Sequence, residues 1–477
     1  MTGGLLQLVA YGAQDIYLTG NPQITFFKVV YRRHTNFALE SIENVFNGVA
    51  RFGNRVTCQI SRNGDLINRM YLVTTLPALE PKPNPTNLTT IKQARWVESV
   101  GLRVIQDVWI EIGGQQIDKH YSEWMYIWNE LSLPVGKRAG YDKMVGNAVG
   151  STATAHGTAL AAPVNGLATN IQDGSTTTSY VVVNRNQSAS TDLPVVRGVF
   201  ATYALAVASS PDTDDIIIKV PVVANSSGTR DAVPTPATKV HIPLEFWFCR
   251  NVGLALPLIA LQYHEVKVNI DFSTLKNCLS KASPADTTAA DLGDASLWVD
   301  YIFLDTDERR RFAQLSHEYL IEQLQFTGDE EVSNTNARLK LNFNHPVKEL
   351  VWVTKKSTND WNDFSTGNTL VNPMSAALLQ LNGQDRFAER PSDYFDTVQP
   401  YQHHENIPVD TPGINVYSFA LKPEEHQPSG SLNFSRIDTA YLSMKMLASA
   451  ASTVKVFAVN YNVLRIMSGM GGLAYSN

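Results

Sequence analysis

The chain has 477 residues, enough for about three domains at roughly 150 residues each, although two longer β-sandwich domains would fit equally well. Its 39 Lys and Arg against 45 Asp and Glu give a net charge of −6, which argues against a protein that wraps nucleic acid. Hydrophobic residues at 44% exclude wholesale disorder, and charged residues at 18% fall below the ~25% typical of soluble domains.

Helical patterns are few. Asn21 and Pro22 can serve as N-cap and first helical residue before an i, i+3, i+7 stripe of Ile24, Phe27 and Tyr31. A second candidate helix runs over residues 122–131. The sequence therefore predicts a short helix near the N-terminus and a second helix over residues 122–131.

Alternation of apolar and polar residues, which is typical of half-buried strands, dominates the rest of the chain. It occurs in residues 56–60, 102–112, 266–272, 339–343 and 457–463. Many short strands separated by Gly, Pro and Asn predict an all-β protein built of sandwiches or barrels.

A faint repeat relates the two halves of the chain. Residues 110–116 (IEIGGQQ) match 379–385 (LQLNGQD), and 122–125 (SEWM) match 392–395 (SDYF). Leu261, Tyr263 and Val266 then match Leu432, Phe434 and Ile437 in the same order. Alternation plus a glycine turn could arise in any two β-domains, but the conserved order favours a duplication.

The first half carries an insertion at about residues 140–240. Residues 146–179 contain 22 Gly, Ala, Ser or Thr out of 34, and Asp173 is their only charged residue. Such a stretch has little to bury, so it predicts a surface loop or a partly disordered segment.

The sequence contains no clear motif for catalysis, phosphate binding or metal binding. The sequence has no GxxxxGK[ST] phosphate loop, no GxSxG nucleophile elbow and no HExxH. The nearest approach to a metal cluster is His403-His404-Glu405, but adjacent histidines of an extended chain point to opposite sides. We therefore predict no catalytic site, no metal and no cofactor.

The cysteines and the first residues of the chain indicate the cellular compartment in which the protein is made. Cys58, Cys249 and Cys278 are far apart, odd in number and without CxxC spacing, which favours a reducing compartment. The start of the chain lacks the features of a secretory signal, and the longest apolar stretch, residues 252–261, is too short to span a bilayer. The sequence thus predicts a soluble protein made inside a cell.

Four blocks spread over the chain resemble the major capsid protein of large nucleocytoplasmic DNA viruses. They are residues 3–46 (beginning GGLLQLVAYGAQDIYLTGNPQITFFKVVYRRH), 112–125 (IGGQQIDKHYSEWM), 305–325 (DTDERRRFAQLSHEYLIEQLQ) and 421–441 (LKPEEHQPSGSLNFSRIDTAY). The resemblance implies a double jelly roll, meaning two tandem eight-stranded sandwiches with a few short helices and a long loop insertion in the first roll. It also explains why no active site is found.

The resemblance further implies domain limits: an arm at 1–35, a first roll at 36–304, a linker at 305–319 and a second roll with the C-terminal tail at 320–477. Three copies would form a homotrimer of pseudo-hexagonal outline, and many such capsomers would tile an icosahedral outer shell. Assembly would take place in the host cytoplasm. The implied partners are minor capsid and penton proteins and an inner membrane or inner shell, with no direct nucleic-acid binding.

Candidate site residues follow from this family reading. The arm residues predicted to touch neighbouring capsomers or minor capsid proteins are Tyr17, Phe26, Phe27, Arg32 and Arg33. We expect Arg309, Arg310 and Arg311 to fix the angle between the rolls. The insertion would form a tower loop, in which Asn186 and Asn225 are candidate glycan attachment sites.

Two alternatives remain open at the level of the sequence. A carbohydrate-binding or carbohydrate-cleaving jelly roll could stack sugars on tryptophans such as Trp109, Trp124, Trp128 and Trp247. A minor structural protein of the same virion is the other alternative, although a penton protein would be expected to have a single roll.

Overall fold

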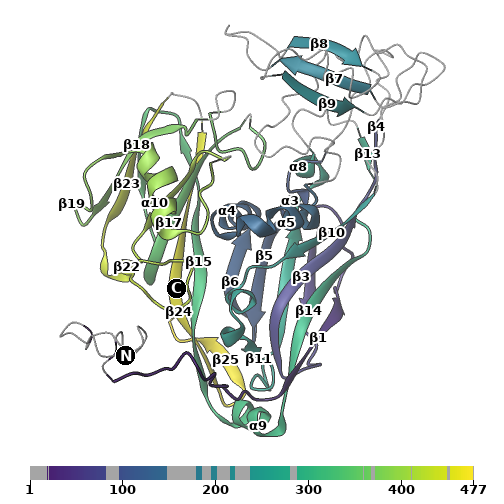
Figure 1. The fold of residues 1–477 in the computed structure, drawn as a ribbon, viewed down its shortest axis with the longest axis vertical. Helices are drawn as coiled ribbons and strands as arrows, with labels where there is room; N and C mark the ends of the chain where they lie inside the picture. The colour runs from purple at the N-terminus through teal and green to yellow at the C-terminus, as the bar shows by residue number, and fades with distance from the viewer. Residues whose placement is uncertain are drawn as a thin grey trace, which may run out of the picture.

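The computed structural model describes residues 15, 19, 21–81, 96–147, 179–184, 195–200, 215–220, 237–279, 287–289, 291–357, 359–366, 371–409, 411–447 and 452–475. Their strands form two sandwiches that stand side by side with the strands running mostly along the long axis (Figure 1). None of the described helices is both long and apolar enough to cross a membrane.

The first roll consists of two antiparallel sheets. One has the order β1 (Phe37–Val45), β14 (Ala295–Leu304), β3 (Leu66–Leu76) and β10 (Thr238–Pro243), with β11 (Leu256–Pro257) paired to β3. The other has the order β2 (Arg55–Gln59), β12 (Val266–Phe272), β5 (Ile105–Ile112) and β6 (Gln115–Tyr121). Alternate residues such as Val108, Ile110 and Ile112 are fully buried between the sheets, as the twofold periodicity predicts.

The second roll repeats this plan. One sheet has the order β15 (His317–Val332), β24 (Ser452–Met467), β17 (Pro346–Lys356) and β21 (Ile414–Ser418), with β22 (Leu432–Asn433) on β17 and β25 (Met470–Leu473) on β24. The other has the order β16 (Asn336–Lys340), β23 (Ala440–Met446), β18 (Met374–Leu381) and β19 (Gln384–Asp385), with β20 (Arg390–Pro391) on β18.

Numbered in chain order, the eight main strands of each roll give the same two sheets, 1-8-3-6 and 2-7-4-5. This is the order of a jelly roll, so the predicted double jelly roll is confirmed.

The faint sequence repeat falls on equivalent places in the two rolls. The first match joins strands four and five through tight turns with positive φ, at Gly113 and Gly114 in one roll and at Asn382 and Gly383 in the other. Such turns have the backbone that type I′ hairpins require. The second match begins the helical segment after strand five, and the third lies before strand seven. The duplication is therefore structural as well as sequential.

Helices are short and lie at the ends and between the rolls. Those of the first roll are α3 (Val100–Val104), α4 (Ser122–Ser132), η1 (Val135–Lys137), α5 (Arg138–Val145), α7 (Trp247–Arg250), η2 (Val252–Leu254) and α8 (Leu275–Cys278). Helix α9 (Thr306–Gln314) connects the rolls, and the second roll holds the π-helical turn η3 (Tyr394–Val398), α10 (Gln399–His403) and η4 (Phe434–Arg436). The helix predicted over residues 122–131 is thus confirmed.

The insertion contains more structure than the sequence predicted. Strands β7 (Ser179–Asn184), β8 (Val195–Phe200) and β9 (Asp215–Val220) form a three-stranded antiparallel sheet in the order β8-β7-β9. Beside it, β4 (Leu79–Pro81) pairs with β13 (Thr287–Ala289). The Ala-, Ser- and Thr-rich stretch after residue 147 lies outside the described residues.

Two sequence predictions are wrong. Residues 21–36 contain no helix, and Asn21 has φ 49°, unlike the extended backbone of an N-cap. The apolar stripe there has nothing to pack against, since Phe27 is 97% exposed, and an isolated short helix is only marginally stable. The strand predicted over 102–112 begins only at Ile105, because residues 100–104 form α3.

The cores of the two rolls are not separate. The larger hydrophobic cluster fills the first roll and continues into one face of the second, where it includes Val351, Val353, Ile414, Val416, Phe457 and Val459. The smaller cluster lies between the sheets of the second roll and includes Leu350 and Trp352 from the opposite face of β17. The sheet β15-β24-β17-β21 is therefore apolar on both faces, and its outer face packs against the first roll.

Candidate assembly surfaces and the junction between the rolls

Helix α4 is the centre of the contact between the rolls (Figure 1). All its residues from Ser122 to Leu131 are buried. The ring of Trp124 lies 5.4 Å from that of Phe457 in β24, and Tyr126 meets Trp361 edge-on at 5.4 Å. Tilted and edge-on ring pairs at these distances are favourable beyond the area that they bury. The junction is therefore built like a protein core.

Glu123 adds an ion pair to this apolar contact. Its carboxylate lies 3.3 Å from Lys455 Nζ of the second roll and 3.2 Å from the Arg103 guanidinium of the first. Burial alone would raise the pKa of Glu123, but Lys455 and Arg103 hold it below its ordinary value. The glutamate is thus charged, and it joins cations from both rolls.

A second charged cluster lies deeper in the junction. Glu322 of β15 receives Arg250 from α7 of the first roll at 3.1 Å and Lys348 from β17 at 2.8 Å. Burial lowers the pKa of Lys348, whose side chain has no exposed surface, while Glu322 opposes that shift. Removing one member of such a cluster would leave an uncompensated buried charge.

Next to Lys348, Glu349 extends this cluster toward α10. Glu349 Oε2 lies 3.1 Å from His404 Nε2, and the Nδ1 of the same ring lies 2.8 Å from Glu424 Oε1. Burial by itself would lower the pKa of His404, but the two carboxylates raise it to about 9. Burial would likewise raise the pKa of Glu349, yet the imidazolium holds it below its usual value. His404 is therefore a buried cation near neutral pH.

Helix α9 carries the three consecutive arginines. Asp305 caps its first turn, because its carboxylate accepts from the Thr306 backbone N–H at 2.7 Å. Arg309 Nε lies 3.0 Å from Asp65, whose other oxygen accepts from the Leu304 backbone N–H at 2.9 Å. The side chains of Arg310 and Arg311 are exposed.

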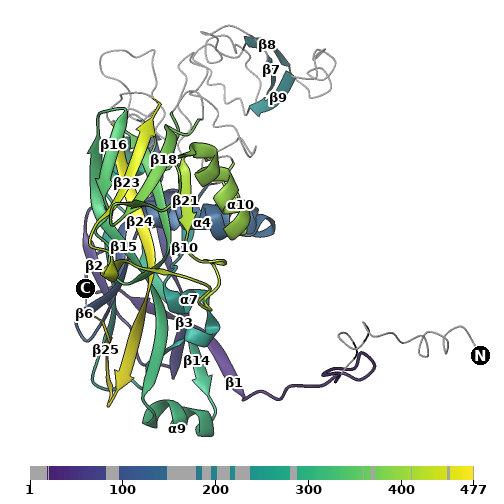
Figure 2. The same cartoon turned by 90° about the vertical axis from the view of Figure 1, so that its left-hand side faces the viewer.

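The N-terminal arm projects from the lower end of the first roll, away from the sheets (Figure 2). Phe26 and Phe27 are 87% and 97% exposed, and Arg32 and Arg33 are also exposed. Tyr17 lies outside the described residues, as do Asn186 and Asn225. Large apolar side chains gathered on one exposed segment mark a contact surface more often than single exposed residues do.

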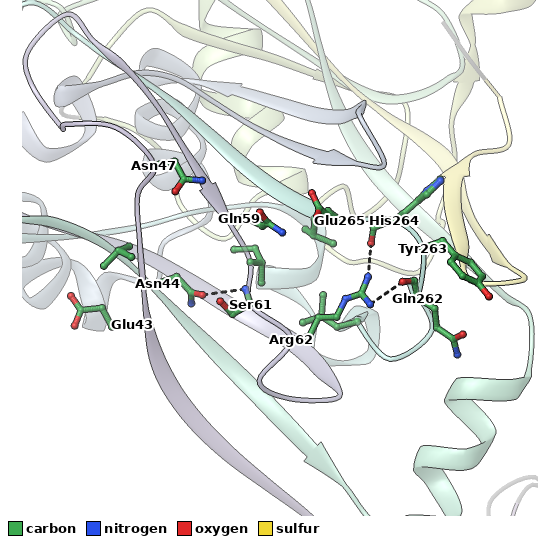
Figure 3. Close-up of a pocket in the computed structure, with 14 residues that line it drawn as sticks. Glu43, Asn44, Asn47, Gln59, Ser61, Arg62, Gln262, Tyr263, His264 and Glu265 are labelled. Carbon is green, nitrogen blue, oxygen red and sulfur yellow. Dashed lines mark hydrogen bonds between the residues drawn. The ribbon is translucent and has the colours of Figure 1, made fainter.

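A polar hollow of about 580 Å³ opens beside β1, β2 and the segment before β12 (Figure 3). The guanidinium of Arg62 donates to the backbone carbonyl oxygens of Gln262 at 2.9 Å and His264 at 3.1 Å. Asn44 Oδ1 accepts from the Ser61 backbone N–H. These polar groups hold loops together, so the hollow offers no convergent set of groups for chemistry.

The tryptophans proposed for the carbohydrate-binding alternative are not accessible to a sugar. Trp109, Trp124, Trp128 and Trp247 are all buried and cannot stack on a sugar. His403 and His404 contact different groups, and among the described residues no set of three His, Cys, Asp or Glu is placed to hold a metal ion. Burial also raises the pKa of the Cys58 thiol to about 11 and that of Cys278 to about 12.

Sequence reasoning missed the charged cluster of the junction. One signal could have found it: Lys348 and Glu349 interrupt the apolar strand PVKELVWV (346–353), where isolated charges need partners. The partners Arg250, Glu322 and His404 come from distant parts of the chain, so the sequence alone does not identify them.

Comparison with known proteins agrees with this architecture. The family model described as "Major capsid protein N-terminus" matches residues 25–305, and that described as "Large eukaryotic DNA virus major capsid protein" matches residues 308–472. The two matches together cover most of the chain, one roll each.

Curated relatives match along their whole length. The major capsid protein of Pyramimonas orientalis virus is 48% identical, and that of Paramecium bursaria Chlorella virus 1 is 38% identical, each with 100% of both chains covered.

Solved structures show the same fold. A chain of the PBCV-1 virus capsid superposes with a TM-score of 0.66 at 34% identity, covering 95% of this chain and 100% of that one. The Faustovirus major capsid protein reaches a TM-score of 0.65 at 14% identity, covering 96% of this chain and 94% of that one. The second match shows the fold alone.

These relatives form a family of structural proteins of the virion shell and not of enzymes, which confirms the expected structural role. The chain belongs to the family of major capsid proteins of large eukaryotic DNA viruses.

Proposed function

We propose that three copies of the chain form a pseudo-hexagonal capsomer, and that many such trimers tile an icosahedral outer shell. The observation that carries this proposal is the duplication: both rolls have the same strand order, so one chain supplies two similar blocks. Three chains then provide six similar blocks around a threefold axis, which gives a nearly hexagonal tile.

The domain limits belong to the same proposal, with the arm at 1–35, the rolls at 36–304 and 320–477, and the linker at 305–319. Sheet membership supports them, because the two sheets of the first roll take their strands from between β1 and β14, and those of the second roll from between β15 and β25. Strand β15 begins at His317, so the end of the linker already pairs with β24. In this arrangement Arg309, Arg310 and Arg311 help to fix the angle between the rolls, and the ion pair from Arg309 to Asp65 supports that role.

The arm would bind neighbouring capsomers or minor capsid and penton proteins on the inner face of the shell, toward an inner membrane or inner shell. The exposure of Phe26 and Phe27 supports this role, and Arg32 and Arg33 add positive charge beside them. Tyr17 belongs to the same proposed surface. Nothing in the proposal needs direct nucleic-acid binding, and assembly would take place in the host cytoplasm.

The insertion would form a tower on the outer tip of the first roll, where Asn186 and Asn225 are candidate glycan sites. Intact-mass analysis of protein from virions tests this part of the proposal. Added hexose masses that are lost in an Asn186→Gln/Asn225→Gln variant would support it, and the bare polypeptide mass would contradict it.

Size-exclusion chromatography with light scattering, followed by negative-stain imaging, tests the trimer. We expect a species of three times 52.7 kDa with a hexagonal outline. A chain that stays monomeric at high concentration, both alone and with the other proteins of the virion, would contradict the proposal.

A further inference from the structure

The two rolls use the same sheet face in different ways. In the second roll, the outer face of β15-β24-β17-β21 is largely buried, because α4 and the rest of the first roll cover it. Val351 and Val353 of β17 have no exposed surface, and Phe457 of β24 lies against Trp124. Within one chain, a helix that follows strand five of one roll therefore packs on this face of the next roll.

The equivalent face of the first roll is open. It belongs to β1-β14-β3-β10 and lies on the side of the molecule that faces away from the second roll (Figure 1). Leu39 and Val45 on this face are 60% and 74% exposed. On the neighbouring strands of the same sheet, Tyr71 and Trp298 are half-buried and stack on each other, with ring centroids 6.3 Å apart. A sheet face with this many apolar groups is normally covered.

The strand registers make the equivalence specific. Tyr71 of β3 pairs with Trp298 of β14, just as Val351 of β17 pairs with Phe457 of β24. Each pair lies on the outer face, next to core residues of the same strand, which are Met70 and Leu72 in β3 and Leu350 and Trp352 in β17. Trp298 thus occupies the position of Phe457, the residue that Trp124 covers.

The second roll carries a helical segment, η3 and α10, that is likewise exposed to solvent. The repeat that aligns residues 122–125 with 392–395 places Val398 and Tyr401 where α4 has Trp128 and Leu131. Those two residues of α4 are buried, whereas Val398 is 38% and Tyr401 74% exposed. Leu421, whose carbonyl oxygen lies 3.0 Å from His403 Nδ1, continues the exposed apolar surface beside α10.

We propose that η3 and α10 of one copy pack on the outer face of β1-β14-β3 of a second copy, so that the contact made by α4 within the chain is repeated between chains. This inference rests on the proposed trimer and names its interface. The sheet β1-β14-β3 lies at the edge of the first roll that is away from the second roll, whereas α10 belongs to the second roll, so the two surfaces do not meet within one chain (Figure 1). A second copy supplies both surfaces at once, and three copies close the ring.

The interchain contact differs from the internal one in its charge. Asp393 of the second roll is equivalent to Glu123 of α4. Ser296, which pairs with Val73 in the first roll, is equivalent to Lys455, which pairs with Val353 in the second. The Glu123–Lys455 ion pair therefore has no counterpart between chains at this position. Glu43, which pairs with Trp298, and Asp300, which pairs with Ser41, lie on the same sheet face, so the contact combines apolar and charged groups and depends in part on salt.

Cross-linking gives a direct test of proximity. In an Asp393→Cys/Ser296→Cys variant, a short bismaleimide should link chains into covalent dimers and trimers, because these positions correspond to a pair 3.3 Å apart within the chain. The native thiols react slowly, since burial raises the pKa of all three. A matched Asp393→Cys/Lys340→Cys variant, with its second thiol at the exposed last residue of β16, should give no trimer band, and neither should the two single variants.

A disruptive variant tests the energetics. Val398→Asp/Tyr401→Asp should raise the concentration at which the trimer half-dissociates by about 100-fold or more, because charges replace central apolar contacts. Gln402→Asp, on an exposed neighbouring position, is the control for added charge. Both variants should keep the wild-type melting temperature of the monomer.

The outcomes separate the two proposals. A wild-type trimer without cross-linked chains in the Asp393→Cys/Ser296→Cys variant overturns the interface but leaves the trimer standing. A wild-type chain that does not trimerise overturns both. If the aspartate variant misfolds, the cross-link alone decides.

Discussion

Raising the pH through 9 should weaken the fold at one identifiable place, the buried imidazolium of His404. Its ring nitrogens lie 3.1 Å from Glu349 and 2.8 Å from Glu424. Burial alone would lower its pKa, but these carboxylates raise it from the ordinary 6.5 to about 9. Because the folded-state pKa exceeds that of the unfolded chain, the stabilisation is complete below pH 6.5 and is lost as the pH rises through 9.

The size of the effect follows from the shift. A difference of about 2.5 pKa units at 1.36 kcal/mol each gives about 3 kcal/mol. Urea unfolding at pH 6, 7.5, 9 and 10 should show this loss in the wild type but not in His404→Gln. Lys348, Glu322 and Arg250 lie in the same cluster in both proteins, so the difference between the two proteins isolates the histidine.

The neighbouring His403 provides the matched control. Its ring contacts a backbone carbonyl oxygen instead of carboxylates, so His403→Gln should follow the wild-type pH profile. Parallel profiles of the wild type and His404→Gln from pH 6 to 10 would refute the reasoning, because they would show that the imidazolium contributes no linked stability.

Three further perturbations test other parts of the structure. Phe457→Ala removes a buried ring that contacts Trp124 and Phe326 and should cost about 3–5 kcal/mol in urea unfolding; a loss below ~1 kcal/mol would show that the junction repacks easily. Gly413→Ala should destabilise the fold by about 2 kcal/mol, because φ is 102° and an added Cβ would meet the Phe364 carbonyl. Gly383→Ala is the control, since Gly383 has φ 79° but lies in an open turn. It therefore shows the effect of the backbone strain without the clash. Arg309→Ala should lower the free energy of unfolding by less than ~1 kcal/mol, since the arginine is largely exposed. Alanine at Arg309, Arg310 and Arg311 together should lower both the trimer yield and the melting temperature. If both values stay unchanged, the three arginines have no role at the junction.

The sequence predicted those parts of the fold that depend on local pattern. Alternation identified β2, β12 and the middle of β24, and the apolar helix pattern identified α4. The weak repeat anticipated the equal strand orders, because its three matches lie at turns and strand starts that each roll needs. These features are encoded within a few residues of each other, so they can be found without knowledge of the tertiary structure.

Other features depend on contacts between distant residues. The stripe of Ile24, Phe27 and Tyr31 has helical spacing, but no surface covers it within the chain and no helix forms. The pairing of His404 with Glu349 joins residues 55 positions apart. The position of the Arg309 side chain could be predicted only in outline, because its carboxylate partner, Asp65, comes from another part of the first roll.

The hydrophobic cluster that runs through both rolls also has a mechanical consequence. A hinge between the rolls would have to expose Phe457, Val351 and the whole inner face of α4 to water, so the chain should behave as one rigid block. The proposed icosahedral shell nevertheless needs different angles between tiles on its flat facets and along its edges. These angles must then be accommodated at contacts between chains and by the exposed arm, while the shape of each chain stays the same throughout the shell.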